Sequence, residues 1–352
     1  MNNICITGFG WSGSGAVSDL IREYDDVKYV QFDNGEDFEF RILFEPDGIK
    51  TLDLLLNEGY CRFFSYKPIQ RFEEMMKANI KRGGYSQIFG SHVEQLTRNY
   101  IESLLDYEME RSTAYERMFD SDWKRGVARI KGEINGFLSK CEKIGLIKGG
   151  KQIRKYELMK MKVAYKPENF IKSTQDYMES LFNQISYGDI RPLVFDQIFP
   201  PDGPERYFKY VPSTFKTIVV VRDPRDTYLL TKCAYGTAPA PMPINNIKDF
   251  ITFYKKSIYD ECKSSNENVL YVYFEDLVYN YEKTKEKIEK FLGISKHARQ
   301  LTKFDPSVSI NNTQLFTKYI EYKKDIEMIE REIPETLYHF RTTINHTSNN
   351  IF

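Results

Sequence analysis

Residues 4–21 read ICITGFGWSGSGAVSDLI, and this stretch decides the fold. A short apolar segment runs into a loop with four glycines and two serines, and the loop opens an apolar-periodic helix. Glycines let backbone N–H groups approach an anion closely, and a helix amino-terminus adds partial positive charge. The stretch therefore predicts a phosphate-binding loop. Because Trp11 stands where a cation is expected and the lysine of nucleotide triphosphatases is absent, we expect a nucleotide other than ATP.

Composition and charge restrict the class of protein. The chain has 352 residues, of which 41% are hydrophobic and 15% aromatic, enough for a substantial core. Fifty basic residues balance fifty acidic ones, which argues against a dedicated nucleic-acid binder. The five cysteines are scattered and form no CxxC pair, so we expect reduced thiols. No run approaches the roughly 18 apolar residues of a membrane span, and the first strand leaves no room for a signal peptide. We expect a soluble, cytoplasmic protein; nothing in the sequence specifies an oligomeric state.

Short β-branched and aromatic runs recur at residues 3–7, 28–32, 193–196, 217–221 and 269–274. They are nearly continuous apolar runs, as the strands of a parallel sheet buried on both faces require. Helical patterns lie between them, for example at residues 16–24, 281–292 and 319–332. We predict an α/β fold with a P-loop-type sheet of mainly parallel strands flanked by helices, in a single domain spanning residues 1–352. Such sheets bind ligands at the carboxyl ends of their strands.

The middle of the chain has a different pattern. Between about residues 70 and 190 we find almost no strand signal and several long amphipathic patterns rich in Lys, Glu and Met. These patterns predict a large helical insertion or lid. Within it, residues 124–166 hold thirteen Lys or Arg against three Asp or Glu. The charges belong either to solvated helix faces or to a basic surface that faces an anionic acceptor or the cofactor.

A second informative segment, residues 217–230, reads TIVVVRDPRDTYLL. An apolar strand delivers Arg222 to its carboxyl end, where Pro224 breaks the strand and a helix begins. We expect Arg222 and Arg225 to lie in the ligand crevice, because guanidinium groups suit bidentate phosphate contacts. Asp226 either orients one of the arginines or caps the helix. The alternative is a surface cluster of ion pairs.

Four motifs occur in a set order: the GxxxSGSG loop at residues 8–15, RDPRD at 222–226, LYVYFEDL at 270–277 and FLGI at 291–294. Their order and spacing resemble the sulfotransferase family that uses 3′-phosphoadenosine 5′-phosphosulfate. The resemblance covers roughly residues 1–33 and 190–317. It implies transfer of a sulfuryl group to a hydroxyl-bearing acceptor of carbohydrate type, as in polysaccharide sulfation, without a metal.

The resemblance also implies roles for single positions. The loop that holds the 5′-phosphosulfate corresponds to Gly10, Trp11, Ser12, Gly13, Ser14 and Gly15, with Trp11 where the family usually has Lys or Arg. Arg222 matches the arginine that holds the 3′-phosphate. The family's serine eight positions later is Leu230 here, so we expect Thr231 or a basic residue elsewhere to replace it. Residues 309–312 lie where the family often has a further cofactor-contacting loop.

Sulfuryl transfer needs a base that takes the proton from the acceptor hydroxyl, and two carboxylates compete for this role. Asp19 lies eight residues after Trp11, the offset at which a catalytic glutamate follows the loop lysine in the glycosaminoglycan branch of the family. Asp196 ends a strand, similar to the place of a catalytic histidine in the cytosolic branch. We rank Asp19 slightly ahead because its match is gapless. Their ordinary roles would be an exposed helix carboxylate and a turn or cap residue.

Other residues and functions stay open. Arg225 or Lys67 could supply the cation missing at Trp11, and His92 could approach the acceptor. The histidines have no metal-ligand spacing, so we expect no metal site. A P-loop kinase acting on a small molecule is one alternative, disfavoured by the missing GK[ST] motif and by the lack of a convincing Mg²⁺-binding aspartate. The other is a non-catalytic nucleotide-binding or scaffolding relative, suggested by the absent lysine and by Leu230.

Overall fold

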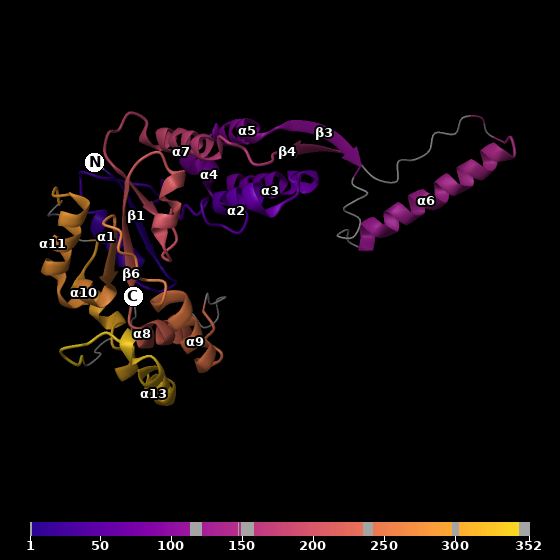
Figure 1. The fold of residues 1–352 in the computed structure, drawn as a ribbon. Coiled ribbons are helices and arrows are strands. Elements are labelled where there is room, and N and C mark those ends of the chain that lie inside the picture. Colours follow the sequence, from indigo (N-terminus) through magenta and orange to yellow (C-terminus); the bar gives the residue numbers. More distant parts are fainter. Residues whose placement is uncertain are drawn as a thin grey trace.

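The computed structural model describes residues 2–112, 122–146, 148, 158–234, 242–297 and 303–344. Its centre is a five-stranded sheet in the order β2-β5-β1-β6-β7, with parallel pairing between neighbours (Figure 1). The strands are β1 (Asn3–Gly8), β2 (Lys28–Tyr29), β5 (Leu193–Asp196), β6 (Phe215–Val221) and β7 (Val269–Tyr273). All five predicted strands are present, although β2 is shorter than expected. The predicted α/β fold with a parallel sheet is confirmed.

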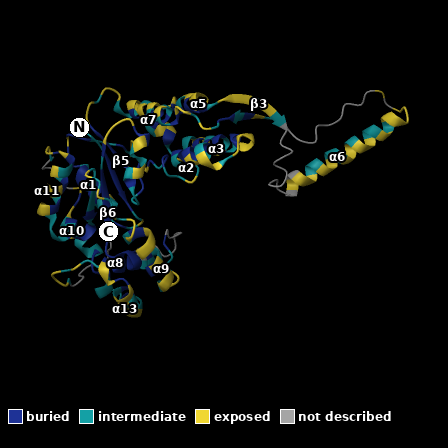
Figure 2. Cartoon of the chain, viewed as in Figure 1, coloured by how far each residue is buried: buried dark blue, intermediate teal, exposed yellow. Residues whose placement is uncertain are grey.

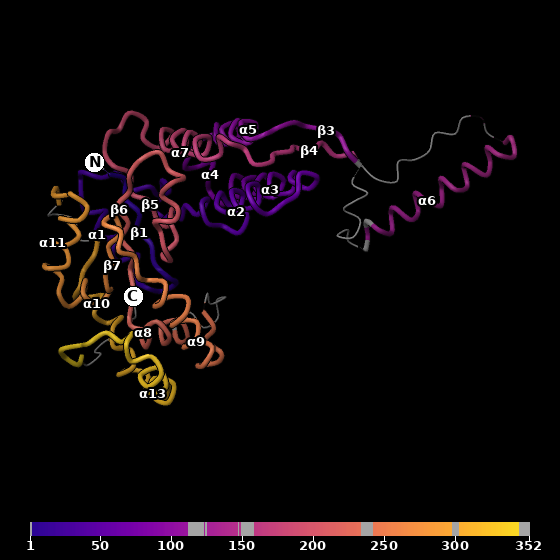
Figure 3. Tube along the Cα trace, in the orientation of Figure 1, coloured from indigo at the N-terminus to yellow at the C-terminus, as the bar shows by residue number. Residues whose placement is uncertain are grey.

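Both faces of the sheet are buried, which explains why its strands are nearly continuous apolar runs. Successive side chains of a strand point to opposite faces. In β1, Ile4 and Ile6 pack with α1 (Ser14–Ile21) and α11 (Tyr281–Leu292). Cys5, between them in sequence, belongs to the other core, which the inserted helices cover. Strand β1 therefore lies inside the sheet, between β5 and β6 from the second half of the chain (Figure 3).

The region between residues 70 and 190 contains helices and also a pair of antiparallel strands. Between β2 and β5 the described α-helices are α2 (Ile49–Leu54), α3 (Tyr66–Arg82), α4 (Tyr85–Phe89), α5 (Val93–Leu104), α6 (Asp122–Lys143) and α7 (Phe170–Ser186). Strands β3 (Tyr107–Ser112) and β4 (Leu158–Val163) pair antiparallel, so a region in which the sequence gives almost no strand signal holds two strands as well as helices. The two strands read YEMERS and LMKMKV, and Lys, Glu and Met are good helix formers. Their alternation nevertheless gives one apolar face, with Met109 opposite Met161 and both packed near Tyr66.

The last third of the chain builds the sheet edge where β6 and β7 end. Its further helices are α8 (Pro224–Leu229), α9 (Ile247–Phe253), α10 (Phe274–Tyr279), α12 (Pro306–Ser309) and α13 (Lys323–Glu332). The helix predicted over residues 319–332 is present as α13, preceded by a short 3₁₀ turn. The predicted helix at residues 281–292 is α11, with Gly293 after it in the left-handed conformation. In the described part of the chain, no helix is both long and apolar enough to cross a membrane.

Candidate functional site

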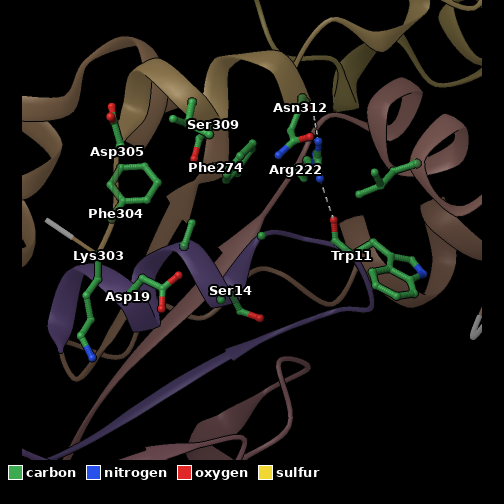
Figure 4. Close-up of a pocket in the computed structure, with 15 residues that line it drawn as sticks. Trp11, Ser14, Asp19, Arg222, Phe274, Lys303, Phe304, Asp305, Ser309 and Asn312 are labelled. Carbon is green, nitrogen blue, oxygen red and sulfur yellow. Dashed lines mark hydrogen bonds between the residues drawn. The ribbon is translucent and has the colours of Figure 1, made fainter. Parts of the chain in front are cut away.

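A cavity of about 480 Å³ lies where the loop after β1 meets the segment after β6. These two strands are neighbours, with Gly8 opposite Val220 at their carboxyl ends. The cavity is therefore at the edge of the sheet where parallel strands bind ligands. The residues that line it include Trp11, Ser14, Asp19, Arg222, Phe274, Lys303, Phe304, Asp305, Ser309 and Asn312 (Figure 4).

The glycine loop lies tightly against the sheet and against α10. Gly13 precedes α1 with a φ of +87°, and a Cβ atom there would lie 2.5 Å from the Phe274 ring. A Cβ atom at Gly8 would lie 2.1 Å from Ser12 Oγ, so Ser12 is turned back toward β1. Ser12 Oγ is buried and has no hydrogen-bond partner among the described residues. Gly13 is therefore required by its surroundings, whereas a side chain at Gly8 would displace the Ser12 hydroxyl.

Only part of the predicted loop faces the cavity. Trp11, Gly13, Ser14 and Gly15 line it, whereas Gly10 is exposed and lies outside the lining. Ser12 is likewise outside the lining, because its side chain packs beneath the loop. Ser14 is thus the serine of this loop that belongs to the cavity lining.

Trp11 connects the loop to the neighbouring strand. Its φ of +63° places it in the left-handed region, which costs a non-glycine residue roughly 1–2 kcal/mol. In this conformation its backbone carbonyl accepts a hydrogen bond from Arg222 Nη1 at 3.2 Å (Figure 4). The strained loop residue thus draws the guanidinium of the neighbouring strand toward the loop.

Arg222 is the most unusual charge in the cavity, because only 4% of the residue is exposed. Its other hydrogen bond goes to the backbone carbonyl of Asn312, and its guanidinium lies 4.7 Å from the centre of the Phe274 ring. The Nε atom of Arg222 has no hydrogen-bond partner among the described residues. The ion pairs of the neighbouring Asp223 and Glu330 are with Arg225 and not with Arg222. A buried charge is costly unless it is paired. The site therefore holds a desolvated cation with capacity for an anion.

Buried carboxyl groups fix the backbone around Arg222. Asp226 accepts hydrogen bonds from the backbone N–H groups of Gln314 and Leu315, both at 2.7 Å. Asp226 therefore holds the segment after Asn312, rather than capping α8 or orienting an arginine. Glu275 accepts a hydrogen bond from the backbone N–H of Asp223 at 2.9 Å. Burial, followed by the charge of Asp223, raises the pKa of Asp226 and raises that of Glu275 to about 8. Near neutral pH, Glu275 therefore contributes little negative charge beside Arg222.

Arg225 does not line the cavity, contrary to the expectation from the sequence. Asp223 caps α8 and also binds the Arg225 guanidinium, with Oδ2 at 2.8 Å from Nη2. Glu330 binds Nη1 at 2.8 Å, and the guanidinium lies over the Phe316 ring. Arg225 therefore belongs to a cluster of ion pairs, which was the alternative interpretation of this segment. Asp223, the residue that caps α8, holds its guanidinium away from the cavity.

Thr231 also lies outside the cavity lining. It is fully buried, and its hydroxyl donates to the backbone carbonyl of Thr227 at 2.7 Å, one turn earlier. Leu230 lines the cavity in its place. The structure puts a different hydroxyl there, that of Ser309, in the segment that the sequence had marked as a further cofactor-contacting loop.

The two candidate bases are placed differently. Asp19 lines the cavity from α1 and forms an ion pair with Arg22 at 2.9 Å. Burial raises the pKa of Asp19, against the opposing effect of Arg22. Asp196 ends β5 outside the lining, and its Oδ1 is buried without a partner among the described residues. Burial, followed by the charge of Glu39, raises the pKa of Asp196 to about 7. The charge of Arg22 lowers the pKa of both carboxyl groups, so both belong to its surroundings.

Lys303 is a cavity residue that the sequence reasoning missed. It is exposed and lies in the lining together with Phe304 and Asp305. The buried carboxylate of Glu23 holds this segment by accepting hydrogen bonds from the backbone N–H groups of Lys303 and Phe304. The only hint in the sequence was the expected cofactor-contacting loop at residues 309–312, which lines the cavity together with Lys303.

Two other candidates lie elsewhere. Lys67 is near the start of α3, with its Nζ 5.3 Å from the centre of the Tyr66 ring. His92 immediately precedes α5. Both are outside the cavity lining.

The cavity can hold an anion between amide donors, a hydroxyl and a buried guanidinium, with a carboxylate at its side. A search against protein-family models and a search among curated proteins give no match to this chain. Its function is therefore inferred from the chemistry of this cavity.

Proposed function

We propose that this protein transfers a sulfuryl group from 3′-phosphoadenosine 5′-phosphosulfate to a hydroxyl of a carbohydrate-type acceptor. The observation that carries the proposal is the buried guanidinium of Arg222, bonded to backbone carbonyls in the cavity that also receives the glycine loop and the start of α1. The start of α1, which follows β1, and the Arg222 guanidinium, which follows the neighbouring strand β6, can each bind an anion. A nucleotide with phosphates on two separate ribose positions suits them better than one with a single phosphate chain. The resemblance of residues 8–15 and 222–226 to sulfotransferases supports the same ligand.

In this proposal the sheet is of P-loop type and each receptor has its own phosphate. The 5′-phosphosulfate binds the backbone N–H groups at Gly13, Ser14 and Gly15 and the Ser14 hydroxyl. The 3′-phosphate binds Arg222, with the Ser309 hydroxyl as a second donor in place of the family's serine. Lys303 supplies positive charge that the loop lacks at Trp11. All of these residues line the same cavity.

The transfer itself needs alignment and charge stabilisation more than covalent chemistry. The acceptor oxygen forms a bond to sulfur while the bond from sulfur to the phosphate oxygen breaks, releasing adenosine 3′,5′-bisphosphate. The three atoms must be held in line. Loop amides and Lys303 stabilise the charge that gathers on the leaving oxygen. The proton of the acceptor hydroxyl passes to a carboxylate, and no metal is part of the proposed reaction.

Asp19 is our first candidate for that carboxylate because it lines the cavity. Asp196 is the second candidate, because a pKa of about 7 suits a base that works near neutral pH. If Asp19 is the base, Asp19→Asn should lower turnover by orders of magnitude while leaving nucleotide affinity nearly unchanged. Retained turnover in Asp19→Asn, together with loss in Asp196→Asn, would assign the role to Asp196.

The nucleotide is tested by thermal-shift measurements with adenosine 3′,5′-bisphosphate, adenosine 5′-monophosphate and ATP. We expect the bisphosphate to stabilise the protein most, because a ligand that binds the folded state raises its melting temperature. Arg222→Ala should remove the advantage of the bisphosphate over the monophosphate. Arg331→Ala is the matched control, because Arg331 is exposed on α13. A preference for ATP, or an unchanged preference in Arg222→Ala, would contradict the proposal.

A non-catalytic nucleotide-binding role is the second candidate, favoured by Trp11 at the position of the loop lysine. Binding of the bisphosphate without sulfuryl transfer to a broad panel of carbohydrate acceptors would favour it. For either function we propose a cytoplasmic location, supported by five free cysteines in the structure.

A further inference from the structure

Helix α6 (Asp122–Lys143) has one continuous apolar side. Its apolar residues recur at alternating intervals of four and three and form what we call the apolar stripe: Trp123, Val127, Ile130, Ile134, Phe137 and Cys141. At 3.6 residues per turn these positions fall within an arc of about 80°. The stripe contains two aromatic and three β-branched side chains. Such a stripe is typical of a helix that lies against an apolar surface.

In the structure this surface is uncovered. Trp123 is 79% exposed, Phe137 is 67% exposed and Ile130 is 58% exposed. Figure 2 shows α6 in yellow and teal, the colours of exposed and intermediate residues. Ile144 and Leu146, just beyond the helix, are also exposed. An apolar face of this size on a single helix indicates an interaction site.

The rest of α6 is basic. The helix carries six Lys or Arg and three Asp or Glu, and the exposed basic side chains include Arg125, Arg129 and Lys140. Residues 124–166 contain thirteen of the fifty basic residues of the chain but only three of its fifty acidic ones. The remainder of this neutral chain is therefore net negative. Positive charge and exposed apolar surface coincide on the same short segment.

We propose that α6 binds the surface of a membrane that contains anionic lipid, with the apolar stripe inserted at the headgroup boundary and the basic residues among the headgroups. A helix with a strong apolar stripe, a Lys- and Arg-rich opposite face and an aromatic residue at one end fits this interface. The helix lies in the membrane plane rather than spanning it. This binding is independent of the proposed sulfuryl transfer.

Charge favours a membrane over a second copy of the chain. The spacing of the apolar stripe also suits a coiled coil. However, Lys131, Lys140 and Glu133 all flank the apolar stripe, and the helix as a whole carries six basic against three acidic residues. Two copies packed along the stripe would therefore bring an excess of positive charge together. The same lysines can extend their charged ends toward anionic headgroups while their stems follow the apolar surface. The helix also contains three glycines, which are poor helix formers and weaken its stability away from a surface.

The test is flotation of the full chain with phosphatidylcholine vesicles, with and without phosphatidylglycerol. We expect binding to the vesicles with phosphatidylglycerol and weaker binding at high salt. Phe137→Glu should weaken binding about tenfold or more, because it removes a large apolar side chain from the apolar stripe. Ser139→Glu is the matched control, since it adds the same charge on the polar side of the helix. Unchanged thermal melting of both variants will show that the fold is intact.

Three outcomes would overturn the proposal. One is that the full chain fails to float with phosphatidylglycerol vesicles. Another is that both variants lose binding equally, which would leave no role for the apolar stripe. The third is a concentration-dependent dimer in sedimentation that Phe137→Glu dissociates and that does not bind vesicles. This last result would make the apolar stripe a contact between copies of the chain.

Discussion

Replacing Asp196 with asparagine should change how the stability of the protein depends on pH. In the folded chain only 8% of Asp196 is exposed, and burial followed by the charge of Glu39 raises its pKa to about 7. In the unfolded chain an aspartate titrates near pH 3.9, as estimated from model peptides. Between about pH 4 and pH 7 the unfolded chain has released a proton that the folded chain keeps. The free energy of unfolding of the wild type therefore falls as the pH rises through this window.

The size of this effect follows from the pKa difference. About three pKa units correspond to about 4 kcal/mol, since one unit is worth about 1.4 kcal/mol. This stabilising contribution is complete below about pH 4 and is lost once the pH exceeds about 7. Asparagine does not titrate, so the free energy of unfolding of the variant does not fall in this pH window for this reason. Between pH 5 and pH 8 the variant should gain roughly 3 kcal/mol in the free energy of unfolding relative to the wild type.

The measurement is urea unfolding followed by circular dichroism at pH 5 and pH 8 for both proteins. For each protein we take the change in the free energy of unfolding between pH 5 and pH 8, and we then compare the variant with the wild type. This comparison cancels the contributions of the other titrating groups and any pH-independent cost of the buried amide. Asp189→Asn is the control, because Arg191 lowers the pKa of Asp189 to about 2 and the group does not titrate in this range. If Asp196→Asn differs from the wild type equally at both pH values, Asp196 is ionised in the folded chain. The case for a base poised near neutral pH would then be lost.

Three further substitutions test the construction of the site. Gly13→Ala should destabilise the fold by about 1–3 kcal/mol and abolish stabilisation by the bisphosphate, because the new Cβ meets the Phe274 ring; thermal melting with and without ligand measures both. Arg225→Ala should lower the free energy of unfolding in urea by about 3–5 kcal/mol, because it leaves Asp223 buried without its partner. The folded fraction should still bind the bisphosphate as the wild type does. Lys303→Ala should weaken bisphosphate binding about tenfold in calorimetry and reduce its salt dependence, with little change in the melting of the ligand-free protein.

The sheet and the centre of the site could be predicted from sequence because their signals are local. Strand β1, the glycine loop and α1 occupy about twenty consecutive residues, and the apolar run of β6 leads directly to Arg222. The direction taken by a side chain after a turn is a different matter. Arg225 is three residues from Arg222, but its contacts with Asp223 and Glu330 decide that it faces away from the cavity. Glu330 lies more than a hundred residues further along the chain.

The parts that were missed depend on distant partners. Strands β3 and β4 pair across 45 intervening residues, and Lys, Glu and Met give them the composition of helices. Only the pairing itself shows that Met109 and Met161 share one apolar face. Lys303 reaches the cavity because the buried carboxylate of Glu23, much earlier in the sequence, accepts hydrogen bonds from the backbone N–H groups of Lys303 and Phe304. No local pattern around residue 303 specifies that contact.

The absent loop lysine has a structural counterpart in the bond between Trp11 and Arg222. A lysine in the loop would place its charge beside the phosphate from within the loop. Here the left-handed conformation of Trp11 turns its carbonyl toward Arg222, so a cation from β6 is held at the loop. The raised pKa of Glu275 reduces the negative charge that this carboxyl group places beside Arg222. A guanidinium fixed by two carbonyls cannot follow a leaving group as a flexible lysine can. Arg222 is therefore suited to holding a bound anion in place, and in the proposed reaction the exposed Lys303 is the residue that we expect to supply charge during transfer.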